Sequence, residues 1–190
     1  NGSNDILELV TQAFLTPGDE AVYAEHAFAV YPLATHARGA KGVVVPAREY
    51  GHDLDAMAAA IGPRTRVVFV ANPNNPTGTW LEPAAIERFV GRIPREVVVV
   101  LDEAYDEYLP AADRSRAVAL VAKHPNLLVS RTFSKAYGLA ALRIGYAIAD
   151  PSVADLMNRV RQPFNVNALA QAAAVAALED VDYVEESARL

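Results

Sequence analysis

Residues 131–146, which read RTFSKAYGLAALRIGY, follow one apolar run, residues 126–130, and lead into a second, residues 144–149. The first run has the length and the content of branched apolar residues of a buried strand. Lys135 comes directly after residues 131–134, which follow this run, and it lies among small and apolar residues. The stretch therefore places a single amine just past the end of a predicted strand.

The surroundings of Lys135 suit amine and phosphate chemistry. An amine among apolar residues at a strand end is a usable nucleophile when desolvation favours its neutral form. Thr132 and Ser134 place hydroxyls before it in the sequence, and Arg143 places a guanidinium after it. These groups would suit a phosphate held beside the amine. The alternative, on this stretch alone, is a loop lysine that extends into solvent.

The composition indicates a globular, acidic protein. Of 190 residues, 52% are hydrophobic and 21% charged, which is enough apolar content for a substantial core. The net charge of −6 and the lack of a basic run argue against a nucleic-acid partner. The absence of cysteine excludes a disulfide scaffold and a zinc ribbon. No apolar stretch reaches the ~18 residues of a membrane helix, so we expect a cytoplasmic protein without a membrane partner.

Both ends of the sequence have the pattern of interrupted elements. Residues 1–4 lie in a predicted loop that enters a helix, and residues 185–190 are helical in pattern without a glycine or proline stop signal. We therefore expect an excerpt of a longer protein.

Helical and strand patterns alternate along the chain. This rhythm is typical of an α/β protein with a mostly parallel sheet flanked by helices. The predicted strands are 21–24, 42–45, 66–71, 96–101, 126–130 and 144–149, and the predicted helices are 6–14, 30–37, 56–61, 83–90, 151–161 and 168–178. We expect Ser3 or Asn4 to cap the first helix, Asp53 or Asp55 the third, and Asp150 the helix at 151–161.

A stiff asparagine loop follows the strand at 66–71. It reads NPNNPTG, residues 72–78, and two Asn-Pro steps restrict its backbone. Because it leaves the carboxyl end of a strand, where open α/β sheets bind ligands, it can hold an asparagine amide in a fixed place. The alternative is a sharp turn without a binding role.

An aspartate ends the next strand. Asp102 follows residues 96–101 directly, and a carboxylate there is costly unless it is paired or bound to a cation. Tyr105, three residues on, can reach the same pocket. The alternative is that Asp102 caps a helix. We expect Asp106 and Glu107 to form a solvated acidic face.

The first helix offers a possible anion site. The free N–H groups in its first turn, at Ser3 and Asn4, suit an anion, although a simple capped helix has the same pattern. Dinucleotide-binding, P-loop and HExxH motifs are absent. The four histidines lack metal spacing and are expected to be ordinary surface or core residues.

Three predicted strand ends thus carry NPNNPTG (72–78), DEAY (102–105) and a lysine–arginine block (134–143). In this order and at these separations, they resemble the fold-type-I aminotransferases that use pyridoxal 5'-phosphate. Within that superfamily, the sequence resembles the histidinol-phosphate aminotransferase family over essentially all 190 residues. The runs that carry this resemblance are GSND (2–5), AEHAFAVYPLATHARGA (24–40), DEAYDEY (102–108) and RTFSKAYGLAALRIGY (131–146).

The resemblance implies a role for each site residue. Lys135 bonds to the cofactor's aldehyde, and Asp102 keeps the pyridine nitrogen protonated. Asn75 and Tyr105 hydrogen-bond the phenolic oxygen, and Phe28 stacks on the ring where many relatives have tyrosine. The groups implied to hold the phosphate are the amides of Ser3 and Asn4, together with Thr132, Ser134 and Arg143. The resemblance also implies a cis peptide bond at Asn75–Pro76.

The resemblance further implies that residues 1–190 are the central part of a large, cofactor-binding domain of α/β/α type. The family's N-terminal arm, and its small domain with the arginine for the substrate α-carboxylate, lie outside this sequence. The full-length form is expected to be a homodimer.

The function implied is transamination of histidinol phosphate with 2-oxoglutarate, which gives imidazole-acetol phosphate and glutamate in histidine biosynthesis. A broad aromatic aminotransferase and a threonine-phosphate decarboxylase would use the same lysine, aspartate and asparagine. A non-enzyme alternative is the aminotransferase-like effector domain of a transcription regulator. A structural relative without activity is disfavoured, because every cofactor position matches.

Overall fold

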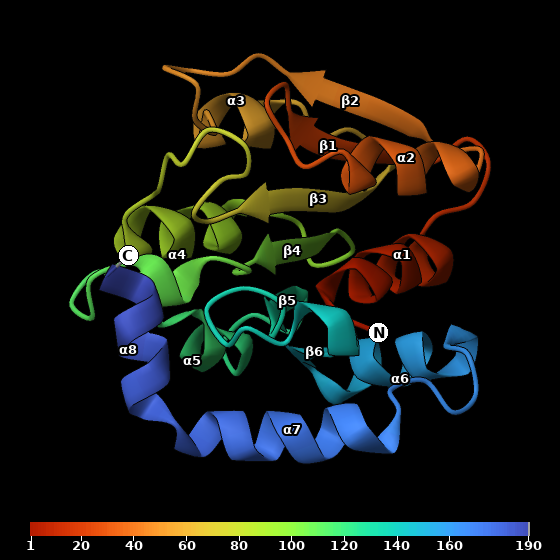
Figure 1. Cartoon of the computed structure of the whole chain (residues 1–190). Coiled ribbons are helices and arrows are strands. Elements are labelled where there is room, and N and C mark those ends of the chain that lie inside the picture. The colour runs from red at the N-terminus through yellow and green to blue at the C-terminus, as the bar shows by residue number, and fades with distance from the viewer. Residues whose placement is uncertain (190) are drawn as a thin grey trace.

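Buried apolar runs form a single six-stranded sheet in the computed structural model, which describes residues 1–189 (Figure 1). The strand order is β2-β1-β3-β4-β5-β6, in which the first five strands are parallel and β6 is antiparallel to β5. The strands are β1 (Glu20–Ala24), β2 (Lys41–Val45), β3 (Thr65–Ala71), β4 (Val98–Asp102), β5 (Leu127–Thr132) and β6 (Gly145–Ala149). The predicted α/β class with a mostly parallel sheet is confirmed.

Helices follow most of the strands and cover both faces of the sheet (Figure 1). The helices are α1 (Ser3–Phe14), α2 (Val30–Ala37), α3 (Leu54–Ala59), α4 (Pro83–Arg92), α5 (Ala117–Val121), α6 (Pro151–Val160), α7 (Ala168–Glu179) and α8 (Val181–Arg189). Two short 3₁₀ turns, Asp106–Tyr108 and Ala140–Leu142, lie in loops after β4 and β5. Among residues 1–189, no helix combines the length and apolar content that crossing a membrane requires.

Two hydrophobic cores fill the spaces between sheet and helices. On one face, α3, α4 and α5 contribute Met57, Phe89 and Leu120 to a cluster with alternate residues of β3 and β4. On the other face, α1 and α6 contribute Leu7 and Met157, and α2 also packs there. Because β3 and β4 are buried on both faces, their sequences are continuous apolar runs without alternation.

Most predicted helix caps are confirmed, but the first is wrong. Asp53 accepts a hydrogen bond from the Ala56 amide, and Asp150 accepts one from the Ser152 amide. The N-cap of α1, however, is Gly2 rather than Ser3 or Asn4, and it makes no side-chain cap. Gly2 has φ 84°, a left-handed conformation that favours glycine, and the Arg143 guanidinium lies 2.8 Å from where a Cβ would be.

Candidate active site

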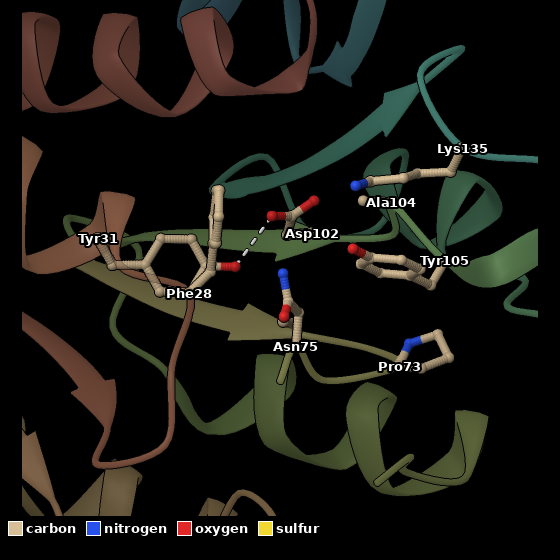
Figure 2. A pocket seen from close by; sticks show the side chains of 9 residues that line it. Phe28, Tyr31, Pro73, Asn75, Asp102, Ala104, Tyr105 and Lys135 are labelled. Carbon is tan, nitrogen blue, oxygen red and sulfur yellow. Dashed lines mark hydrogen bonds between the residues drawn. The ribbon is translucent and has the colours of Figure 1, made fainter. Parts of the chain in front are cut away.

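The carboxyl ends of β3, β4 and β5 and the loop after β1 surround one pocket (Figure 2). Five of the predicted site residues meet there from four separate segments, and Figure 2 shows Lys135 and Asn75 pointing toward the space beside Asp102. Ligands of open α/β sheets bind at this end of the strands. The residues that line the pocket are Phe28, Tyr31, Ala71, Pro73, Asn75, Asp102, Ala104, Tyr105 and Lys135.

Asp102 is the last residue of β4 and lies at the back of this pocket, only 5% exposed. Its Oδ2 accepts a hydrogen bond of 2.9 Å from the Tyr31 hydroxyl, whereas its Oδ1 is buried without a partner among the described residues. Burial raises the pKa of Asp102 to about 6, although the Tyr31 hydrogen bond and the Lys135 charge both lower it. The 3₁₀ turn that follows is capped at Tyr105, so Asp102 is not its N-cap residue.

Tyr31 is a site residue that the sequence analysis missed. It lies in the first turn of α2, is fully buried, and stacks on Phe69 of β3 with ring centroids 4.6 Å apart. A signal existed, because a buried tyrosine needs a partner for its hydroxyl and Asp102 was already expected to be buried. Sequence alone does not show that α2 brings the two together.

Lys135 lies exposed at the mouth of the pocket, where its Nζ is 5.1 Å from the centroid of the Tyr105 ring. An ammonium over an aromatic face is attracted by the ring quadrupole, so Tyr105 holds the lysine head toward the pocket (Figure 2). The lysine is therefore solvent-accessible, as in the alternative interpretation, and also part of the pocket.

The three asparagines of the 72–78 loop have different surroundings. The Asn72 amide group exchanges hydrogen bonds with the backbone of Leu81, and Asn74 Nδ2 donates to the His26 carbonyl. Asn74 thereby ties the loop that carries Phe28 to the loop that carries Asn75. Asn75 is half-buried and lines the pocket. The predicted cis peptide at Asn75–Pro76 is confirmed, and Asn72–Pro73 is also cis.

The remaining predicted residues gather around the start of α1. The Arg143 guanidinium lies against Gly2 and donates to Ser134 Oγ at 3.3 Å. Gly145 packs so closely that an added Cβ would lie 2.7 Å from the Ser3 amide nitrogen. An amide of the helix N-terminus, a guanidinium and the hydroxyl of Ser134, which directly precedes Lys135, thus lie close together, and this combination suits an anion.

Two members of the predicted phosphate set face other partners with their side chains. Thr132 is buried, and its Oγ1 accepts a hydrogen bond from the Ser134 amide. Asn4 Nδ2 donates to Glu8 Oε1, which leaves the backbone amide of Asn4 for the anion role. The phosphate contacts of all five residues stay predictions.

The whole chain, residues 1–190, matches the family model of class I and II aminotransferases. The chain belongs to this aminotransferase family. It is 67% identical over 187 residues to the histidinol-phosphate aminotransferase of Methylobacillus flagellatus, covering 98% of this chain and 50% of that protein. It is 65% identical over 190 residues to histidinol-phosphate aminotransferase 1 of Cupriavidus pinatubonensis, with 100% and 50% covered.

A solved structure of the same family has the same fold. The histidinol-phosphate aminotransferase from Sinorhizobium meliloti, in complex with pyridoxal-5'-phosphate, superposes with a TM-score of 0.91 at 33% identity. The match covers 96% of this chain and 50% of that one. The chain thus spans about half the length of the relatives it matches.

A buried ionic cluster lies behind the pocket of this aminotransferase chain. Arg131 of β5 donates through Nε and Nη2 to Glu103 Oε2 at 2.9 and 2.7 Å, and through Nη2 to Asp106 Oδ2 at 3.3 Å. Glu103 is fully buried, and burial raises its pKa to about 7 against the opposing charge of Arg131. The cluster joins the segment that carries Tyr105 to the strand that leads to Lys135.

The prediction of a solvated face at Asp106 and Glu107 is wrong, because these residues are only 3% and 7% exposed. Asp106 is held by Arg131 and by the Ser115 amide. Arg114 donates to the Glu107 carbonyl. Arg131 comes from a different strand, and Arg114 and Ser115 from the loop that folds back over these residues, so the local run of acidic residues gave no sign of burial.

Proposed function

We propose that the full-length protein is a pyridoxal 5'-phosphate-dependent aminotransferase that acts on histidinol phosphate and 2-oxoglutarate. Its products would be imidazole-acetol phosphate and glutamate. The observation that carries the proposal is the buried Oδ1 of Asp102, which has no hydrogen-bond partner among residues 1–189 and faces a pocket whose mouth holds Lys135. A buried carboxylate oxygen of this kind needs a cationic or donating partner.

The pocket residues fit that cofactor. Asp102 Oδ1 is the acceptor that a protonated pyridine nitrogen requires, and the aromatic ring of Phe28 lines the same pocket. Asn75 and Tyr105 carry the amide and phenol that would hold the cofactor's phenolic oxygen. The phosphate would lie at the start of α1, near Ser134 and Arg143, where charge-assisted donors converge.

The side chains of this chain have distinct tasks in the proposed reaction. When bound, the cofactor supplies an electron sink for the carbon that loses a proton. Lys135 Nζ would link to the cofactor's aldehyde carbon with loss of water and, once the amino donor has displaced it, would take the proton from the donor's α-carbon and deliver it to that former aldehyde carbon. Asp102 keeps the ring nitrogen protonated, and Tyr105 keeps the lysine head at the pocket mouth.

The choice of histidinol phosphate rests on the names of the relatives that are 65–67% identical. The alternatives, a broad aromatic aminotransferase and a threonine-phosphate decarboxylase, would need the same pocket residues. Substrate contacts outside residues 1–190 would separate them, and those contacts include the proposed arginine for the α-carboxylate.

We further propose that residues 1–190 form the central part of a large domain in a cytoplasmic homodimer. Supporting the homodimer is an exposed apolar surface on and beside α7, which buries only Ala170 and Ala174 against the rest of the chain. Phe164, 99% exposed, lies just before this helix. The exposed large apolar residues of α7 are Leu169, Val175 and Leu178.

A single-turnover half-reaction of the full-length protein tests the proposed function. The cofactor-loaded protein is mixed with histidinol phosphate, phenylalanine or threonine phosphate, and the absorbance change of the cofactor is followed. We expect histidinol phosphate to react fastest and Lys135→Ala to lose the reaction almost completely. Faster reaction with phenylalanine, or carbon dioxide release from threonine phosphate, would contradict the assigned substrate. No reaction with any donor would favour a regulatory domain.

A further inference from the structure

We propose that Tyr31 is a positioning residue that occupies one oxygen of Asp102 and directs the other into the pocket as a carboxylate acceptor. The inference rests on the proposed function, because the group that meets the free oxygen is the cofactor's ring nitrogen. Tyr31 acts on that group through Asp102, whose charge and orientation it sets.

The hydroxyl of Tyr31 is held in place from several sides. The ring stacks on Phe69 with an interplanar angle of 5°, and it meets Phe28 edge to face with the two ring centroids 6.0 Å apart. The Tyr31 carbonyl accepts a hydrogen bond of 2.7 Å from Thr35 Oγ1 within α2. A fully buried ring fixed in this way can offer its hydroxyl in only one direction, and that direction is Asp102 Oδ2.

The two oxygens of Asp102 are thereby made different. Oδ2 accepts the Tyr31 hydrogen bond at 2.9 Å, whereas Oδ1 is also buried and has no partner within residues 1–189 (Figure 2). The phenol remains a donor, because burial and the neighbouring Asp102 charge keep the pKa of Tyr31 well above its ordinary value. A fixed donor on one oxygen stabilises the ionised carboxylate and leaves a single acceptor for a cation.

Without Tyr31, the same buried carboxylate would lose the side-chain hydrogen bond to its Oδ2. Burial raises the pKa of Asp102 to about 6, and loss of the Tyr31 hydrogen bond would remove one of the interactions that lower this pKa. A hydrogen bond to a charged group is worth roughly one to two pKa units. The midpoint would then reach or pass neutral pH, and a neutral Asp102 could not hold a pyridinium.

Carbon-13 NMR of aspartate carboxyls in the cofactor-free, full-length protein measures this effect directly, with Asp102→Asn identifying the resonance. We expect Tyr31→Phe to raise the Asp102 midpoint by about 1 to 2 pH units. The matched control is Tyr23→Phe, which removes a hydroxyl from another buried tyrosine that packs over Gly42. An unchanged midpoint in Tyr31→Phe, or an equal change in Tyr23→Phe, would overturn the proposal.

Binding of two cofactor analogues adds a second readout. Tyr31→Phe should weaken binding of pyridoxal 5'-phosphate about tenfold at neutral pH, but leave binding of 1-deazapyridoxal 5'-phosphate, which lacks the ring nitrogen, unchanged. Equal weakening of both ligands would mean that Tyr31 only packs the pocket. Failure of the wild-type protein to bind pyridoxal 5'-phosphate would contradict the proposed function, while the NMR result would still decide the role of Tyr31.

The double variant Tyr31→Phe, Asp102→Asn keeps the proposal testable if the single variant Tyr31→Phe fails to fold. If Tyr31→Phe unfolds because a buried carboxylate is left bare, removing that charge should restore the fold. If the double variant is destabilised as much as Tyr31→Phe alone, the tyrosine acts through packing and the proposal is wrong.

Discussion

Replacing Asp102 with asparagine should raise the free energy of unfolding of the cofactor-free protein and lower the rate of the cofactor-loaded one. In the cofactor-free chain, burial raises the pKa of Asp102 from 3.8 to about 6, a difference of about 2 units. At 1.36 kcal/mol per unit, ionising this carboxylate in the folded protein costs about 3 kcal/mol. An amide side chain in its place would keep an acceptor for the Tyr31 hydroxyl without that cost, so the cofactor-free variant should be the more stable protein.

The sign of the effect fixes its pH dependence. Because the folded protein holds the proton more tightly than the unfolded chain, wild-type stability is lost as pH rises from about 4 to about 6. The stability advantage of Asp102→Asn should therefore be about 3 kcal/mol near pH 8 and roughly half of that near pH 5. Urea unfolding of the cofactor-free, full-length protein at both pH values measures it. If Asp102→Asn were less stable than the wild type by the same amount at both pH values, ionising the Asp102 carboxylate would not destabilise the folded protein as we expect.

The same substitution should impair the reaction. Without the carboxylate, the ring nitrogen loses its proton-holding partner, and the electron sink weakens. The cofactor should still bind through the phosphate groups and Lys135, but the rate should fall by roughly 10²-fold or more, which corresponds to about 3 kcal/mol of barrier. Single-turnover kinetics with a good amino donor measures this loss. A near wild-type rate would refute the role of Asp102.

Three further substitutions test other parts of the structure. Gly145→Ala would place a Cβ 2.7 Å from the Ser3 amide nitrogen and 2.8 Å from the Arg131 carbonyl, so it should displace the start of α1 and weaken cofactor binding. The control is Gly91→Ala, whose Cβ would meet only a side chain at 3.7 Å. Equal cofactor binding by both variants would argue against an anion site at α1. Arg131→Met leaves buried Glu103 without its cation and should lower the free energy of unfolding by about 3–5 kcal/mol. Arg159→Met, which removes a surface ion pair, should lower it by less than about 1 kcal/mol. Similar losses in the two variants would contradict the role of Arg131 in stabilising a buried carboxylate. Since burial raises the pKa of Glu103 from 4.5 to about 7, wild-type stability should decline as pH rises through that interval, and Glu103→Gln should flatten the decline in urea unfolding; an unchanged slope would contradict the assignment.

The fold was predictable because its strands are buried on both faces. Residues 67–71 of β3 and 98–101 of β4 are apolar without alternation, and a polar residue, Asn72 or Asp102, follows each run directly. Parallel strands bring such residues to one edge of the sheet, and the resemblance to the aminotransferase family implied that Asn75, Asp102 and Lys135 share one site there. Helix α5, only five residues long, has too short a pattern to be recognised.

The contacts that sequence could not give are those set by docking between distant segments. The Tyr31–Asp102 hydrogen bond joins residues 71 positions apart, and the Arg131–Glu103 pair joins residues 28 apart. In each case a polar group is buried because a partner arrives from another element. The local sequence shows that Asp106 and Glu107 are acidic, but it does not show which partners make their burial possible.

The central claim is that Lys135 is the amine that bonds to the cofactor. Borohydride treatment of the cofactor-loaded, full-length protein, followed by peptide mass spectrometry, tests it most directly. We predict that the pyridoxyl group is fixed to the peptide that contains Lys135, the lysine whose Nζ faces the Tyr105 ring in the pocket. Lys41 and Lys123 form ion pairs with Glu20 and Glu87 and lie outside the pocket residues. A label on either of them, or on no lysine, would contradict the account.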